Sequence, residues 1–559
     1  MAEQPEPPEQ PAREGDRALH SAIGRLTGGI SPAAVATAYL DWSMHLLGSP
    51  SKQAELWAKA LAPDGDAEPD AINGKDTRFD DPAWQAFPFN LIRQQFLRQE
   101  AWWDAATRDV HGLDPKHARI VNFATRQMLD MAAPTNFAAT NPLVLKRTQA
   151  ERGQNLVRGL ENWLADLNAY LGGKRPVDPA FRVGDTLAAT PGKVVFRNRL
   201  IELIRYTPTV PKLHPEPLLI VPAWIMKYYI LDLSQQNSMV KYLCDQGFEV
   251  FMISWKNPGA EDADLGMQDY VDLGVRAALE QIADRGAARS VHAVGYCLGG
   301  TLLSIAASAM ARDGDRRFAT LTLLASQVDF SEPGELGLFI NESQVAFLED
   351  IMASQGYLDA DQMAGAFRML RSNDLIWSRV VRHYLLGERT PESDLMAWNA
   401  DSTQMPARMH SEYLRALFLH NELAKGLYRV DDRPVALTDM RAPIFCVGTE
   451  KDHVSPWRSV YRLLLLTDTD VTFLLTNGGH NGGILSEPGH PGRHYRMRQK
   501  TEGDPHRSAA LWLEAAVETP GSWWPVWADW LKQKSGAQGA PQVRKMKSLC
   551  DAPGLYVRG

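Results

Sequence analysis

One short stretch constrains the fold of this chain more than any other feature of its sequence. Residues 291–300 read VHAVGYCLGG, and TLLSIAASAMA, a run of small and apolar residues, follows directly. An apolar β-run, a G-x-C-x-G turn and a helix together indicate a nucleophile elbow, a strained bend that holds its central side chain away from the backbone. Gly295 and Gly299 allow the strand and the helix to approach without a clash. The stretch therefore predicts that Cys297 is a nucleophile.

The alternative is a structural cysteine, because free cysteine is often a small core residue. The position of Cys297 between a strand and a helix favours a role as nucleophile. The N-terminus of the following helix also favours the thiolate form of its side chain. An elbow of this kind needs two backbone N–H groups as oxyanion donors. We expect one from Leu298, and the other from the loop after LLIVPAW, near Trp224.

Short apolar runs alternate with helical segments on both sides of the elbow. The runs are residues 218–221, 249–254, 291–295, 319–325, 444–448 and 471–475. Apolar strands joined by amphipathic helices such as 268–285 predict a mostly parallel sheet covered on both faces. Residues 193–206 (KVVFRNRLIELIRY) predict a hairpin that turns at Arg197–Asn198. With the elbow, this pattern indicates the α/β class and an α/β-hydrolase fold.

In such a fold an acid and a histidine follow the nucleophile in that order, each after a later strand. Asp452 lies in a polar turn after IFCVGT, and His480 lies in a glycine-rich loop after VTFLLT. Taken singly, each has an ordinary interpretation as a turn aspartate or a loop histidine. Their order and context predict a triad of Cys297, Asp452 and His480. The neighbouring His453 is interpreted as structural or as a support of the triad.

The chain has 559 residues, too many for one compact domain. Residues 1–20 are rich in Pro and Glu, so we expect a disordered tail. Residues 21–180 carry apolar side chains at spacings of three and four, which predicts an N-terminal helical domain. Residues 181–559 are expected to form the catalytic domain, with a mostly helical cap inserted at about 328–440.

Charge and cysteine content restrict the partners and the location. A net charge of −8 argues against a nucleic-acid partner. The four cysteines have neither metal-ligand spacing nor a dense disulfide pattern, so we expect no metal, no cofactor and a reducing compartment. The sequence has no recognisable secretory signal and no transmembrane stretch. We therefore expect a cytoplasmic protein.

A cysteine where most such elbows carry serine favours acyl transfer over hydrolysis. A thiolate that attacks a thioester exchanges one thioester for another, so the acyl group stays activated on the enzyme. His480 would take the thiol proton and later protonate the leaving thiolate. Asp452 would orient His480 or help it to deprotonate an acceptor hydroxyl.

Ten stretches, in order and over most of the chain, resemble signatures of the polyhydroxyalkanoate synthases. They are PTNFAATNP (134–142), PAWIMKYYILDL (222–233), FMISWKNP (251–258), GYCLGG (295–300), SQVDFSEPGELGLFI (326–340), GAFRMLRSNDLIWS (365–378), WNADSTQMP (398–406), EKDHVSPW (450–457), GGHNGG (478–483) and APGLYV (552–557). The long N-terminal region resembles the one-subunit-type synthases.

This resemblance implies that the substrate is an (R)-3-hydroxyacyl-CoA and that a polyester chain grows on Cys297 with release of coenzyme A. It implies Asp452 and His480 as the other triad members. It also implies a homodimer as the active form and residence on polyester inclusions.

Two other functions fit parts of the sequence. A thioesterase or polyester depolymerase on the same fold would release free acid, but the cysteine and the long cap disfavour it. A granule-binding scaffold without activity is disfavoured by the complete triad. Four N-terminal tryptophans either bind inclusions or contact the cap, or they pack between helices, as burial tendencies favour. They are Trp57, Trp84, Trp102 and Trp103.

Overall fold

The structure is a computed structural model that describes residues 11–27, 29–61, 77–172, 180–283, 290–360, 362, 376–389, 391–540 and 546–559. The chain divides into two compact units. Unit 1 consists of residues 1–22, 177–362 and 393–559, and unit 2 consists of residues 23–176 and 363–392. No helix in the described ranges is both long and apolar enough to cross a membrane.

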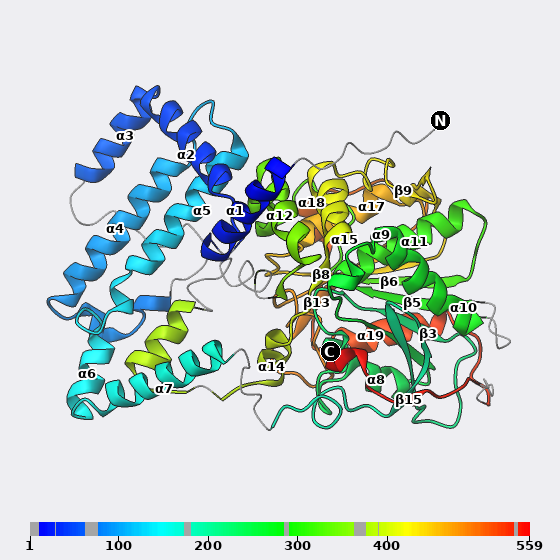
Figure 1. The fold of residues 1–559 in the computed structure, drawn as a ribbon. Helices are drawn as coiled ribbons and strands as arrows, with labels where there is room; N and C mark the ends of the chain where they lie inside the picture. Colours follow the sequence, from blue (N-terminus) through cyan, green and yellow to red (C-terminus); the bar gives the residue numbers. More distant parts are fainter. Residues whose placement is uncertain are drawn as a thin grey trace. The chain divides into compact units, whose positions relative to one another are not determined.

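Unit 2 is built from helices (Figure 1). They are α2 (Pro32–Leu47), α3 (Pro50–Leu61), α4 (Phe89–Thr107), α5 (Pro115–Ala132), α6 (Pro142–Ala150) and α7 (Gln154–Leu171), with short turns η2 (Thr77–Phe79), η3 (Pro82–Gln85) and η4 (Pro134–Asn136). Ser31, Asp114 and Asn141 accept N–H bonds at the starts of α2, α5 and α6, and a proline follows each. This combination satisfies the free N–H groups of a helix start and presets its backbone angle.

The four N-terminal tryptophans have different environments. Trp84 is fully buried in a cluster with Phe79 and Phe96. Trp102 and Trp103 pack beside another cluster, whereas Trp57 is 68% exposed. Helix packing therefore accounts for three of the four.

The middle of the predicted cap belongs to unit 2 and packs on α7. The π-helical segment η10 (Val380–Leu385) faces α7, where Nδ2 of Asn155 donates to the carbonyl of Leu385 at 2.8 Å. Asp166 accepts hydrogen bonds from the Tyr384 hydroxyl at 2.9 Å and from Arg389 at 2.8 Å. The expectation of one cap at 328–440 within the catalytic domain is thus wrong for this segment. These contacts join residues more than 200 positions apart, so no local pattern predicts them.

A helix occupies part of the expected disordered tail. Helix α1 spans Pro11–Thr27, so the prediction of disorder is wrong over residues 11–20; residues 1–10 lie outside the described ranges. Nδ1 of His20 lies 2.6 Å from Oδ2 of Asp350, and its ring lies 5.4 Å from that of Phe347. Both partners belong to α12 (Glu342–Gln355), far along the chain. They give α1 a surface on which to pack.

Unit 1 is organised around an 11-stranded sheet in the order β14-β13-β12-β11-β6-β5-β3-β4-β2-β1-β15. The strands are β1 (Gly192–Arg197), β2 (Ile201–Tyr206), β3 (Leu218–Val221), β4 (Val250–Trp255), β5 (Val291–Tyr296), β6 (Phe318–Leu324), β11 (Ile444–Thr449), β12 (Val471–Thr476), β13 (His494–Lys500), β14 (Glu518–Pro520) and β15 (Cys550–Asp551). The six from β4 to β12 run parallel. They confirm the six predicted runs, and the β1–β2 hairpin is confirmed as well.

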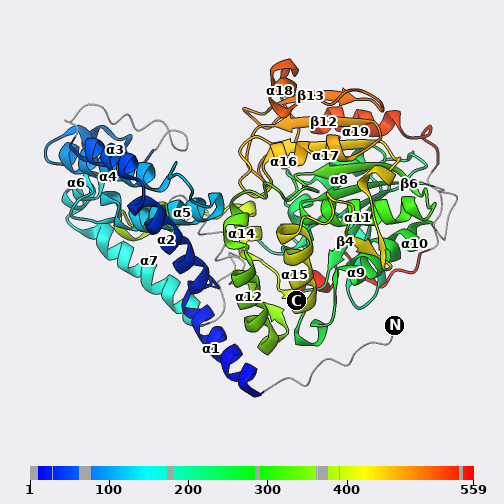
Figure 2. The ribbon, with the colours of Figure 1, turned by 90° about the horizontal axis from the view of Figure 1, so that it is seen from above.

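The three outer strands were not predicted. Strand β13 lies beside β12, as Figure 2 shows, and runs antiparallel to it. Strand β14 pairs antiparallel with β13, and β15 pairs antiparallel with β1. Strand β13 reads HYRMRQK and is half-buried, so it lacks an apolar run. Its arginines donate to backbone carbonyls, for example Arg496 to Ala516 at 2.9 Å. Strands of this kind depend on their neighbours more than on their own sequence.

Helices cover both faces of the sheet. Helices α8 (Met239–Asp245) and α19 (Trp524–Gln533) share one face, where Nε1 of Trp527 donates to Oγ1 of Thr322 at 3.0 Å. The opposite face carries α11 (Leu298–Arg312), and α16 (Trp457–Tyr461) packs on Phe473 there. Further helices are α9 (Met267–Asp269), the π-helical η7 (Tyr270–Arg276), α10 (Ala277–Ala283), α17 (Leu463–Leu466) and α18 (Ala509–Ala515). The prediction that helices cover both faces of the sheet is thus confirmed.

The insertion between β6 and β11 is mostly helical where it is described, as predicted. In unit 1 it contains α12, α14 (Asp394–Ala400), α15 (Ala407–Glu412), the π-helical η11 (Tyr413–Leu419) and the short strand pairs β7 (Tyr357–Leu358) with β8 (Met405–Pro406) and β9 (Arg429–Val430) with β10 (Arg433–Pro434). Residues 363–375 lie outside the described ranges.

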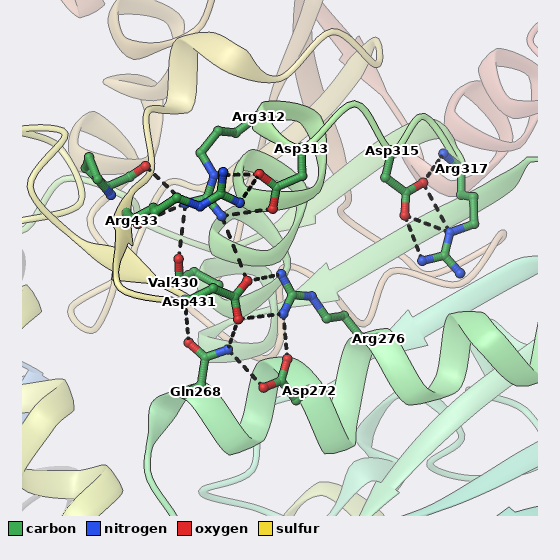
Figure 3. A network of polar contacts seen from close by, with 11 residues as sticks. Gln268, Asp272, Arg276, Arg312, Asp313, Asp315, Arg317, Val430, Asp431 and Arg433 are labelled. Carbon is green, nitrogen blue, oxygen red and sulfur yellow. Dashed lines mark hydrogen bonds and ion pairs between the residues drawn. The ribbon is translucent and has the colours of Figure 1, made fainter.

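A network of charged side chains ties the β9–β10 hairpin to the rest of unit 1 (Figure 3). Asp431, in the turn of the hairpin, lies 2.7 Å from Arg276 of η7. Arg312 of α11 donates to the carbonyl of Val430 at 3.1 Å. Partly exposed ion pairs each contribute about 0–1 kcal/mol. The network therefore determines the position of the β9–β10 hairpin, at the end of the insertion, more than it stabilises the fold.

The close approach of α7 and η10 gives a stability prediction. A Cβ at Gly159 would lie 1.8 Å from the carbonyl oxygen of Tyr384, so Gly159→Ala should weaken this contact by about 1–3 kcal/mol, as overpacking does. The measurement is the rate of trypsin cleavage after Arg382, which should rise. Gly15→Ala, in α1 where a Cβ has free space, is the matched control and should leave it unchanged. Equal cleavage rates in Gly159→Ala and wild type would contradict the packing.

Candidate active site

The predicted elbow is present between β5 and α11. Cys297 has φ 52° and ψ −126°, a backbone conformation that is costly for any residue but glycine. A Cβ at Gly295 would lie 2.3 Å from Cα of Gly300, and one at Gly299 would lie 2.1 Å from the carbonyl oxygen of Val221. Only glycine fits at both positions, so the two glycines allow β5, α11 and the end of β3 to meet around the cysteine.

The three predicted triad residues lie together. Nδ1 of His480 is 2.8 Å from Oδ2 of Asp452, and Cys297 lies close enough to His480 to raise the pKa of its imidazole. Because a carboxylate only accepts, Nδ1 must carry the proton, and Nε2 is left for another partner. The Cys297 residue is 7% exposed. The three side chains thus lie together in a buried site, in the arrangement that a nucleophile, a base and an orienting acid require.

Asp452 is held in place by four hydrogen bonds. Its Oδ1 accepts from the backbone N–H groups of Val454 at 2.9 Å and Ser455 at 2.8 Å. Its Oδ2 accepts from Oγ1 of Thr449 at 2.8 Å and from His480. An ionised carboxylate has about four acceptor positions. All four are occupied, so the carboxylate has one fixed orientation toward the imidazole.

Burial and charge act in opposite directions on this pair. Burial raises the pKa of Asp452, but the charge and hydrogen bond of His480 and the bonds from Ser455 and Thr449 outweigh it, so the pKa is lowered. Burial lowers the pKa of His480, but the charges of Asp452 and Cys297 and its bonds to both raise it well above its usual value. The site therefore holds a proton on His480 beside an ionised Asp452.

Several side chains near the triad were missed by the sequence analysis. Thr449, at the end of β11, binds Asp452 directly. The Tyr296 hydroxyl donates to Oδ1 of Asn481 at 2.6 Å, which ties the residue before the nucleophile to the residue after His480. Burial, and then the charge of Cys297, raises the pKa of Tyr413 in η11. Thr449 and Asn481 stand close to predicted residues in sequence, so only their hydrogen bonds distinguish them.

The two residues predicted to donate backbone N–H groups to the oxyanion both lie beside the elbow. Leu298 is the first residue of α11, where N–H groups have no carbonyl one turn earlier to bind. Trp224 belongs to the β3 loop (residues 222–227), which begins in contact with Gly299. The Trp224 ring is buried against Tyr270, with centroids 5.0 Å apart.

His453, the neighbour of Asp452, has a partner outside the triad. It is half exposed, and its Nδ1 lies 3.7 Å from Oε1 of Glu335.

Comparison with known proteins identifies the family of the chain. The family described as "Poly-beta-hydroxybutyrate polymerase (PhaC) N-terminus" matches residues 75–243, and "alpha/beta hydrolase fold" matches residues 216–484. A second family, "Poly-beta-hydroxybutyrate polymerase N terminal", matches residues 10–52. A poly(3-hydroxyalkanoate) polymerase of Methylorubrum extorquens is 40% identical, over 90% of this chain and 85% of the relative. The chain belongs to the poly(3-hydroxyalkanoate) polymerase family.

Other members of this polymerase family agree over similar lengths. The poly(3-hydroxyalkanoate) polymerase subunit of Rhizobium meliloti (strain 1021) is 37% identical, over 93% of this chain and 85% of the relative. That of Cupriavidus necator is 34% identical, over 86% of this chain and 83% of the relative. Both matches extend through the N-terminal helices and the sheet domain, so the resemblance noted in the sequence signatures is confirmed.

The opposing effects on His480 give a titration prediction. In Asp452→Asn the carboxylate charge is gone and burial dominates, so the pKa of His480 should fall. NMR titration of labelled histidine measures it directly. Thr449→Val, which removes a bond to the same oxygen but leaves the charge, should cause a much smaller shift. An unchanged His480 pKa in Asp452→Asn would contradict the pairing.

Proposed function

We propose that this chain polymerises (R)-3-hydroxyacyl-CoA into polyester and releases coenzyme A, through an acyl group bound to Cys297. The observation that supports this most is a cysteine on a strained bend, close to a histidine that a buried aspartate orients. Relatives named as poly(3-hydroxyalkanoate) polymerases match nearly the whole chain.

The first step transfers the acyl group to the enzyme. The Cys297 sulfur, its proton held by His480, attacks the thioester carbonyl, and a new carbon–sulfur bond forms. The bond to the sulfur of coenzyme A breaks, and the leaving thiolate takes the proton from Nε2 of His480. The N–H groups of Leu298 and Trp224 are the proposed donors to the oxyanion. One thioester replaces another, so the acyl group remains activated.

The second step extends the chain. The hydroxyl of another 3-hydroxyacyl unit gives its proton to Nε2 of His480 and attacks the Cys297 thioester. An ester bond forms, and the thiolate of Cys297 leaves. The extended chain, still a coenzyme A thioester, then acylates Cys297 again and releases coenzyme A. Because Asp452 has no free acceptor position, we propose that it acts through His480 and not directly on the hydroxyl.

We further propose that the protein is a cytoplasmic homodimer located on the surface of polyester inclusions. Helix α7 supports the attachment, because it carries a row of exposed apolar side chains beside the face that binds η10. They are Leu156, Val157, Leu160, Trp163 and Leu164. Exposed apolar surface of this kind commonly marks an interaction site.

The reaction is tested with (R)-3-hydroxybutyryl-CoA, with measurement of coenzyme A, insoluble polymer and free acid. Wild type should give coenzyme A and polymer, and Cys297→Ala should lower coenzyme A release by at least about 100-fold, because its nucleophile is gone. Cys446→Ala, which changes a buried cysteine in β11, is the control. Free acid as the main product would indicate a hydrolase, and activity retained in Cys297→Ala would indicate another nucleophile.

The proposed attachment of α7 to polyester inclusions is tested separately. The double variant Leu160→Gln/Trp163→Gln should sediment less with polyester particles while its rate on soluble substrate stays unchanged. Leu511→Gln, at an apolar residue of α18 that is 57% exposed, controls for a general change in surface polarity. Equal sedimentation of the double variant and wild type would reject α7 as the attachment surface.

A further inference from the structure

Two hydrogen bonds hold the β3 loop on either side of one peptide group. Nε1 of Trp255 donates to the carbonyl of Pro222 at 2.9 Å, and Oγ1 of Thr403 donates to the carbonyl of Trp224 at 2.6 Å; both bonds are buried. A carbonyl and the N–H that follows it belong to one planar group. The two bonds therefore fix the peptide groups before Ala223 and after Trp224.

The peptide group between these two carries the N–H of Trp224. Within the described ranges, no acceptor lies in hydrogen-bonding reach of this N–H. The loop begins beside the elbow, since a Cβ at Gly299 would lie 2.5 Å from the carbonyl oxygen of Pro222. A buried, unpaired N–H is costly unless a ligand satisfies it. This N–H is therefore available to bind a ligand.

Thr403 lies inside the insertion between β6 and β11, in the segment that runs from the end of α14 to β8. We call residues 398–403 the return strap. Nε1 of Trp398 donates to the carbonyl of Lys227 at 2.8 Å, and the N–H of Thr403 donates to the carbonyl of Ile225 at 3.4 Å. The strap thus runs along the β3 loop and contacts it through backbone and side chains.

We infer that Thr403 is a positioning residue for the oxyanion donor at Trp224. This inference rests on the proposed function, because it requires a tetrahedral intermediate at an acyl carbon bound to Cys297. The N–H of Leu298 is oriented by α11, whereas that of Trp224 is oriented by Trp255 on one side and by Thr403 from the return strap on the other. The oxyanion hole is therefore complete only when the strap lies on the β3 loop.

Kinetics of Thr403 variants test the inference. Thr403→Val keeps the shape of the side chain but loses the hydroxyl, so kcat for coenzyme A release should fall about ten-fold, less than the loss of a donor itself costs. KM should change little, and Thr403→Ser should keep most of the activity. Alkylation of Cys297 by iodoacetamide forms no oxyanion, so its rate should stay unchanged. Thr403→Ala replaces the valine variant if the latter does not fold.

Tyr229→Phe is the matched control. It removes the 2.8 Å hydrogen bond from the Tyr229 hydroxyl to Asp401, which joins the strap to the turn just after the β3 loop without touching the donor peptide, and kcat should stay unchanged. An unchanged kcat in Thr403→Val would overturn the inference, and so would a parallel fall in the alkylation rate. If Cys297→Ala also kept its activity, the proposed function itself would fail, which separates the two results.

Discussion

The bend at Cys297 is the constraint on which the rest of the site depends. Its left-handed backbone is held because glycines at 295 and 299 allow β5, α11 and the end of β3 to come within contact distance. In a parallel sheet, the loops after the strands gather at one edge. The bend therefore places the sulfur at the edge where the loops carrying Trp224 and His480 also begin. A larger residue at either glycine would separate these parts.

Much of this arrangement could be predicted from the sequence because its signals are local. The elbow, the six buried parallel strands and the order of Asp452 and His480 each follow from a few neighbouring residues. The parts that could not be predicted depend on distant contacts. Helix α1 packs through His20 on residues more than 300 positions away, and η10 lies on α7. Thr403 resembles any polar loop residue until its bond to Trp224 is seen.

The insertion between β6 and β11 is anchored at separate places. Its middle packs on α7 in unit 2, its return strap lies on the β3 loop, and its last hairpin is bound through Asp431 to Arg276. Each anchor includes directional hydrogen bonds or ion pairs. Such contacts specify position more than they add stability. The cap is thus joined both to the N-terminal helices and to the proposed oxyanion hole.

The proposed function depends on the identity of the group that carries the polymer. The most direct measurement is mass spectrometry of the enzyme, quenched during turnover of (R)-3-hydroxybutyryl-CoA and digested to peptides. The account predicts one or more 3-hydroxybutyryl units on the peptide that contains Cys297, and none on those that contain Cys244, Cys446 or Cys550. Acyl groups on any other residue, or a Cys297 peptide that stays unmodified while polymer accumulates, would contradict it.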